Sequence, residues 1–183
     1  MLLDVGNKVV YPCQGPCRIS SVIEKVIGDK PKRFYHLALL DDSGGELFVP
    51  VDGIQTVGIR MLLKKSEIPA LINRLMMKAE ISKERKQRAK DILKRFTSGS
   101  VFDLAEIVES LTELGKAKSL SLREDWTLVR ARKLLICEIS QVMGETKTAA
   151  EVRVNQALES KATRDTNRMP NYLLAVAELS QSR

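Results

Sequence analysis

The sequence predicts an α+β protein in which a small antiparallel β-barrel is followed by an all-α helical domain. Within the first sixty residues, short runs rich in β-branched and aromatic residues are separated by proline and glycine about every ten positions. From Lys64 onward, apolar residues recur at helical spacing instead. We therefore expect two domains, residues 1–62 and residues 63–183, the second ending in an extension from about residue 145.

The expected strands all lie before residue 52. They cover residues 5–11, 17–26, 33–40 and 46–51. Proline and glycine, including Pro12, Gly15, Gly28 and Gly44, mark the turns between them. Short strands joined in this way are typical of a small barrel, whose edges are either closed or free to pair with another chain.

Four helices are expected in the second domain. They cover residues 66–76, 82–96, 101–114 and 121–139. The last opens with Ser121 and Glu124 at the spacing of a capping box, in which each side chain binds the backbone N–H of the other residue. In the extension we expect a helix near residues 149–158, a polar break near 163–170 and a short apolar piece at 172–179.

The positive charge is concentrated in one block. Residues 1–60 contain 7 basic residues (Lys and Arg) and 7 acidic residues (Asp and Glu). Residues 61–100 contain 11 basic and 4 acidic residues, and residues 101–183 contain 12 of each. A basic segment between two neutral ones indicates a polyanion site, because neutralised phosphates release their counterions. A solubilising helix face would give the same charge pattern.

The predicted helix at residues 82–96 carries most of this charge. Its lysines recur at spacings of three, four and four, so they can follow a phosphate backbone together: Lys83, Lys86, Lys90 and Lys94. Arg85, Arg88 and Arg95 are expected to fan to one side. Nothing marks a recognition helix, so we expect contacts to the backbone and shape of DNA more than base readout.

The residue types present offer little for catalysis or metal binding. His36 is the single histidine and lies in a strand pattern, where a structural role is the commoner one. Cys13 and Cys17 flank a turn, but a four-ligand zinc site needs further ligands. Gly44 and Gly45 precede a strand, whereas a phosphate-binding loop opens a helix. We therefore expect no enzymatic activity, no metal and no cofactor.

The chain shows no targeting or membrane segment. No stretch approaches the roughly 20 apolar residues of a membrane span, and the first residues do not resemble a signal peptide. Three cysteines, an odd number, do not form a disulfide framework, so reduced thiols are expected. These features predict a cytoplasmic protein without membrane contacts.

Several short motifs stand in a fixed order along the chain. They are residues 5–12 (VGNKVVYP), Gly15, Val49-Pro50, residues 57–60 (VGIR), Ser98-Gly99, Leu120-Ser121 and Ala131-Arg132. Over about residues 4–142 this order resembles the CarD/CdnL family of bacterial transcription regulators. The resemblance implies a Tudor-like β-barrel that binds the lobe of the RNA polymerase β subunit. It also implies a helical domain that contacts promoter DNA at the upstream edge of the bubble, through backbone and minor groove, and modulates open-complex stability.

The resemblance also implies site residues. Polymerase contacts fall on Lys25, Ile27 and Phe48, although some members carry an arginine at the position of Phe48. A protein of this family is expected to be a monomer that reaches the nucleoid through RNA polymerase.

The predicted DNA-binding residues follow from both the basic helix and the family resemblance. They are Lys83, Arg85, Lys86, Arg88 and Lys90. Arg88 and Lys90 match basic positions of the family, whereas Arg85 stands where the family presents a tryptophan wedge. Asp125 also replaces a residue that is often basic, and the single tryptophan, Trp126, belongs to a later helix.

Two other functions fit the same residues. One is an architectural DNA-binding protein in which the barrel is only a scaffold. The other is a diverged paralogue that binds polymerase but uses its altered helical face for a protein partner. Binding to polymerase and to DNA separates these possibilities.

Overall fold

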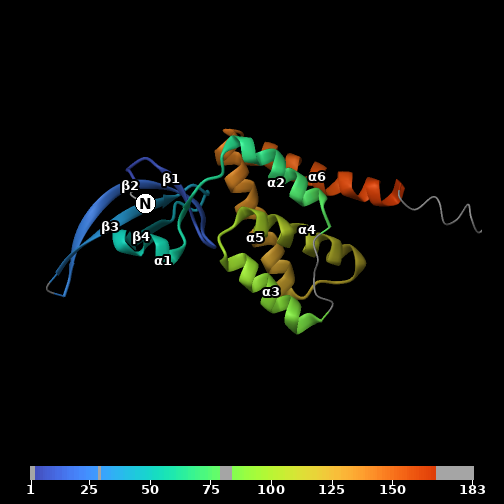
Figure 1. Cartoon of the computed structure of the whole chain (residues 1–183), viewed down its shortest axis with the longest axis horizontal. Coiled ribbons are helices and arrows are strands. Elements are labelled where there is room, and N and C mark those ends of the chain that lie inside the picture. The colour runs from blue at the N-terminus through green and yellow to red at the C-terminus, as the bar shows by residue number, and fades with distance from the viewer. Residues whose placement is uncertain (1–2, 29, 79–83, 168–183) are drawn as a thin grey trace, which may run out of the picture.

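The structure is a computed structural model that describes residues 3–28, 30–78 and 84–167, with side chains up to Ser160. A β-sheet forms one end of the molecule and a group of helices the other (Figure 1). None of the described helices is long and apolar enough to cross a membrane.

Five antiparallel strands form one sheet, in the order β4-β3-β2-β1-β5. Their bounds are β1 Lys8–Tyr11, β2 Gly15–Ile27, β3 Lys30–Leu39, β4 Glu46–Pro50 and β5 Arg60–Met61. The first four lie where the sequence predicts strands. The antiparallel sheet agrees with the prediction of a small barrel with closed or free edges, but closure is not seen: β4 and β5 are the two edges, and no pairing joins them among the described residues. A 3₁₀ turn, η1 (Val51–Gly53), and the short helix α1 (Ile54–Val57) carry the chain from one edge to the other.

One face of the sheet is packed into a small core. Val9, Ile19 and Leu37 are almost completely buried there, as alternation along a strand requires. Tyr35 reaches the same core and donates its hydroxyl hydrogen bond to the carbonyl oxygen of Leu3, at 2.9 Å. The opposite face of β2, β3 and β4 is therefore left outside this core.

Among the described residues, the 3₁₀ turn η2 (Lys65–Glu67) and five α-helices form the second part of the chain. Their bounds are α2 Ile68–Met76, α3 Arg85–Thr97, α4 Val101–Ala117, α5 Leu122–Met143 and α6 Lys147–Asn167. Helices α4 and α5 supply most of the fully buried side chains of this part, among them Ile107, Leu111, Leu135 and Ile139. Helix α6 continues into the polar break predicted near residues 163–170. Residues 163–167 contain neither proline nor glycine, and polarity alone does not end a helix.

Glu138, on α5, joins the two parts of the molecule. Its side chain is 1% exposed and accepts two hydrogen bonds from the guanidinium of Arg60 on β5, at 2.7 and 2.8 Å. The backbone N–H of Leu63 donates a third, at 3.2 Å. Arg60 Nε also donates to the carbonyl oxygen of Gly99, between α3 and α4, at 2.7 Å. A carboxylate withdrawn from water needs such partners, because its desolvation costs several kcal/mol.

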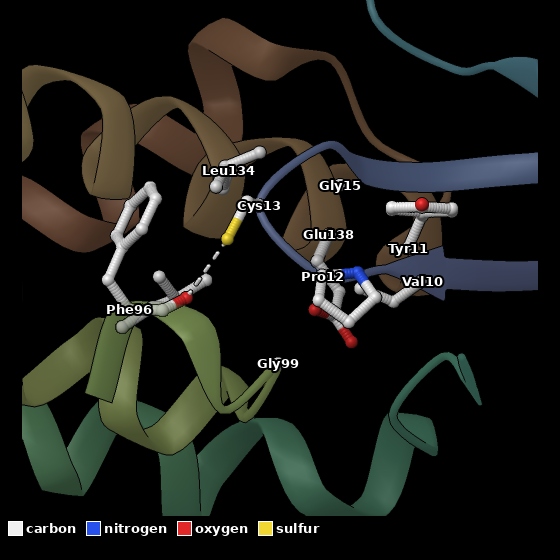
Figure 2. Close-up of a pocket in the computed structure, with 10 residues that line it drawn as sticks. Val10, Tyr11, Pro12, Cys13, Gly15, Phe96, Gly99, Leu134 and Glu138 are labelled. Atoms are coloured by element: carbon white, nitrogen blue, oxygen red, sulfur yellow. Dashed lines mark hydrogen bonds between the residues drawn. The ribbon is translucent and has the colours of Figure 1, made fainter. Parts of the chain in front are cut away.

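The β1–β2 turn fits against α5 and the end of α3 (Figure 2). Gly15 has φ +98°, and a Cβ there would lie 2.9 Å from Leu134 Cδ2, so both the backbone and the space favour glycine. Cys13 Sγ donates to the carbonyl oxygen of Phe96 at 3.5 Å, and Arg130 donates to the carbonyl oxygen of Cys13 at 3.0 Å. The turn is therefore held from both helices.

The three cysteines are free thiols, as expected. Burial raises the pKa of Cys17 to about 12 and also raises the pKa of Cys13 and of Cys137. Cys137 Sγ donates to the carbonyl oxygen of Leu40 at 3.6 Å, across the two parts of the chain. Thiols that stay protonated are poor nucleophiles and poor metal ligands, so these cysteines have a packing role.

Helix α5 begins with the predicted capping box. Ser121 Oγ accepts a hydrogen bond from Glu124 N at 3.4 Å, and Glu124 Oε2 accepts one from Ser121 N at 2.9 Å. The other oxygen of Glu124 accepts a bond from Arg88 Nε on α3, at 2.8 Å. Burial by itself would raise the pKa of Glu124, but the bonds from Ser121 and Arg88 outweigh it and lower the pKa to about 2.

Replacing Glu124 with glutamine should lower the free energy of unfolding at pH 7 by about 3 kcal/mol, since the folded pKa of about 2 lies well below the ordinary 4.5. A carboxylate whose pKa is lower in the folded state stabilises the fold at pH values above its pKa in the unfolded state. This stabilisation is lost as the pH falls toward its pKa in the folded state. The difference in free energy of unfolding between wild type and Glu124→Gln, measured by urea unfolding, should therefore be less than half as large at pH 3 as at pH 7. A difference that does not change with pH would show that Glu124 is not bound in this way.

Candidate interaction sites

The three residues predicted to contact RNA polymerase lie on one face of the sheet. Lys25 and Ile27 are two positions apart on β2, so their side chains point to the same side. The strand register sets His36 opposite Ser21 on β2 and opposite Phe48 on β4. Ser21, Lys25 and Ile27 share one side of β2, and Phe48 therefore lies on that side as well. We call the surface formed by Lys25, Ile27, His36 and Phe48 the outer face.

Phe48 is the centre of the outer face. Its side chain is exposed, and Lys25 Nζ lies 4.3 Å from the centroid of its ring, which is a cation–π distance. The ring of His36 stacks against it, with the centroids 4.8 Å apart and the planes 11° apart. The outer face thus offers a partner an apolar ring with a positive charge directly beside it.

Strands β2 and β3 continue past their neighbours as a two-stranded ribbon. In the described residues, β4 pairs only with residues 34–38 of β3, and β1 only with residues 15–18 of β2. Val26 and Ile27 near the turn of this ribbon are exposed, as are Lys30, Lys32 and Arg33. Apolar side chains among positive charges, on a projecting ribbon, indicate a contact surface for a partner that is partly apolar and partly acidic.

Helix α3 exposes three of the five residues predicted to bind DNA. Arg85, Lys86 and Lys90 all reach solvent, and Lys94 follows one turn after Lys90. Leu93 is exposed on the same helix. Lys83, the fourth predicted residue, lies outside the residues that the structure describes.

Arg88, the fifth predicted residue, does not belong to this surface. Its side chain is only 4% exposed and pairs with Glu124 at 2.8 Å. The sequence predicts Arg88 as a DNA-binding residue, but in the structure this side of α3 packs against the start of α5 and covers its side chain. Arg95 is also engaged, in an ion pair with Glu106 at 3.0 Å. The exposed basic face of α3 accordingly consists of Arg85, Lys86, Lys90 and Lys94.

An exposed apolar stripe on α5 was missed by the sequence analysis. Leu122, Trp126 and Val129 are 91%, 63% and 62% exposed, although all three are large apolar residues. Their spacing of four and three places them on one side of the helix. The same spacing could have indicated this stripe, but an apolar stripe in a sequence is ordinarily assigned to the core.

Comparison with known proteins agrees with this arrangement. A family model described as the CarD-like/TRCF RID domain matches residues 3–63, which include all five strands. A second, described as the C-terminal domain of CarD, matches residues 72–155. The chain is also similar to the candidate transcription factor YdeB of Bacillus subtilis (strain 168), with 26% identity over 150 residues that cover 80% of this chain and 95% of that protein. The chain therefore belongs to the CarD-like family of transcription regulators, which are not enzymes, and its sheet is an RNA polymerase-interacting domain.

Proposed function

We propose that this regulator binds the lobe of the RNA polymerase β subunit through the outer face of its sheet and binds promoter DNA, near the upstream edge of the bubble, through α3. In binding both, it modulates the stability of the open complex. The observation that carries the proposal is the pair of exposed surfaces with different chemistry. One is an aromatic and cationic face on the polymerase-interacting domain, and the other is a basic helix face on the second domain.

The polymerase contact is supported by the edge position of β4. An edge strand has one row of N–H and C=O groups free to pair with a strand of another protein. Phe48 lies on this edge strand with its ring exposed, and aromatic residues frequently dominate the binding energy of interfaces. Main-chain pairing would supply affinity, while Phe48 and Lys25 would select the partner.

The DNA contact is supported by the positive charges of α3. Lys86, Lys90 and Lys94 recur once per turn, which suits successive phosphates along one strand. Arg85 stands at the start of the helix, and arginine is favoured in narrow minor grooves. An arginine there provides charge but no flat apolar ring, so the contact we propose is mainly electrostatic.

The polymerase contact predicts that Phe48→Ala weakens the affinity for RNA polymerase core enzyme by about tenfold or more, as expected for a central aromatic residue of an interface. Lys25→Glu should weaken it as well, since it reverses the charge beside the ring. Titration of labelled full-length protein measures both, with Leu122→Ala and Lys118→Glu as matched controls on exposed positions of the helical part. Wild-type affinity of both Phe48→Ala and Lys25→Glu would place the polymerase contact elsewhere.

The DNA contact predicts binding that is weak, largely independent of sequence and strongly reduced by salt. Changing Arg85, Lys86 and Lys90 together to glutamine should reduce the slope of log affinity against log salt by up to about three units, one for each phosphate that is no longer neutralised. The control changes Lys30, Lys32 and Arg33 of the ribbon to glutamine, which removes the same charge from another surface. Equal reductions in both variants would mean that net charge, and not the face of α3, determines DNA binding.

A further inference from the structure

The exposed ring of Phe48 raises the question of what keeps it in place. Phe48 lies on an edge strand, so the only described strand that pairs with β4 is β3. A half-exposed side chain with few neighbours would exchange between rotamers and lose that freedom on binding. A ring that is already fixed in the free protein avoids this cost.

His36 is the residue in a position to fix the ring. It is the direct partner of Phe48 in the β3–β4 register, and the two rings stack nearly parallel. Offset stacking of this kind is favourable, beyond the area it buries, by enough to alter a binding constant by about 2- to 12-fold. Lys25 approaches the same ring from β2, so residues from three adjacent strands meet at Phe48.

His36 is held more firmly than the ring it supports. His36 is half-buried, whereas Phe48 is exposed. Ser21 Oγ lies 3.5 Å from Nδ1 of His36. Glu46 Oε2 lies 3.2 Å from Nε2 of His36, within ion-pair distance but without the geometry of a hydrogen bond. Its neighbours on β3, Tyr35 and Leu37, are buried in the core on the other side of the sheet. The imidazole is thus flanked on both edges, above a backbone that the core holds in place.

We propose that His36 is a positioning residue of the polymerase-binding surface. It holds the ring of Phe48 stacked against the imidazole and beside Lys25, so that the ring and the ammonium group meet the polymerase as one ordered unit. This inference rests on the proposed function of the outer face. It assigns His36 no contact of its own with the polymerase, and it requires a planar ring at position 36 and not a charge.

The test compares His36→Leu, which removes the flat ring, with His36→Phe, which keeps it without the imidazole nitrogens. Affinity for RNA polymerase core enzyme is measured for both, alone and combined with Phe48→Ala. The ring proton shifts of Phe48 are recorded by NMR in the free full-length protein and assigned by their absence in Phe48→Ala. The thermal unfolding midpoint of each variant shows whether the sheet remains folded.

The inference predicts that His36→Leu weakens affinity by about three- to tenfold while His36→Phe stays within about twofold of wild type. In the Phe48→Ala background His36→Leu should have no further effect. In the free protein His36→Leu should move the Phe48 ring shifts toward those of an unstacked phenylalanine, and His36→Phe should not.

Each contrary result has a separate meaning. If Phe48→Ala weakens binding but His36→Leu does not, the inference is overturned and the proposed polymerase surface stands. If His36→Leu and His36→Phe weaken binding equally, His36 contacts the polymerase itself and the positioning role is overturned. The same conclusion follows if His36→Leu weakens binding as much in the Phe48→Ala background as in wild type. If Phe48→Ala binds as wild type does, the proposed surface fails and the inference fails with it. If His36→Leu unfolds the sheet, the His36→Phe variant alone decides the test. A loss of affinity for RNA polymerase in His36→Phe then contradicts the inference.

Discussion

The buried ion pair between Arg60 and Glu138 is the interaction on which the arrangement of the two domains depends. Glu138 is almost completely buried, yet its carboxylate has three donors within hydrogen-bond distance. Arg60 belongs to β5, the last strand along the chain, and Glu138 belongs to α5. Removing Arg60 would leave the buried Glu138 carboxylate without its charged partner, which typically costs about 3–5 kcal/mol.

Helix α5 connects this junction to the proposed DNA surface. Its first turn binds α3 through Glu124 and Arg88, and its middle contacts the β1–β2 turn through Arg130 and Leu134. Lys147 and Asp42 form a further ion pair between the two parts of the chain, at 2.7 Å, but Asp42 is exposed, so this pair contributes less. A single helix therefore sets the position of the basic face relative to the outer face of the sheet. A factor that holds polymerase and DNA together gains from this, because both contacts then form without ordering a linker.

Local features of the sequence predicted much of this structure. The strands, the capping box at Ser121 and the change to helical spacing near Lys64 all depend on neighbouring residues, and the structure confirms them. Features set by distant residues were not predictable in the same way. The spacing of charges on α3 does not reveal which side is covered, so the sequence groups Arg88 with the exposed basic residues although its buried side chain pairs with Glu124, 36 positions away. The partnership of Arg60 and Glu138 spans 78 positions and has no local signal. Whether the sheet closes likewise depends on the pairing of its two edge strands, β4 and β5, which are separated along the chain by η1 and α1.

The central claim is that Arg60 and Glu138 hold the sheet and the helices as one rigid body. Residual dipolar couplings of the backbone amides, measured in a weakly aligning medium, test it directly. In wild type, one alignment tensor should fit the couplings of β1 to β5 and of α3 to α5 together. In Arg60→Met, which leaves the Glu138 carboxylate without its charged partner, the two sets should need separate tensors. Wild-type couplings that already require two tensors would contradict the claim.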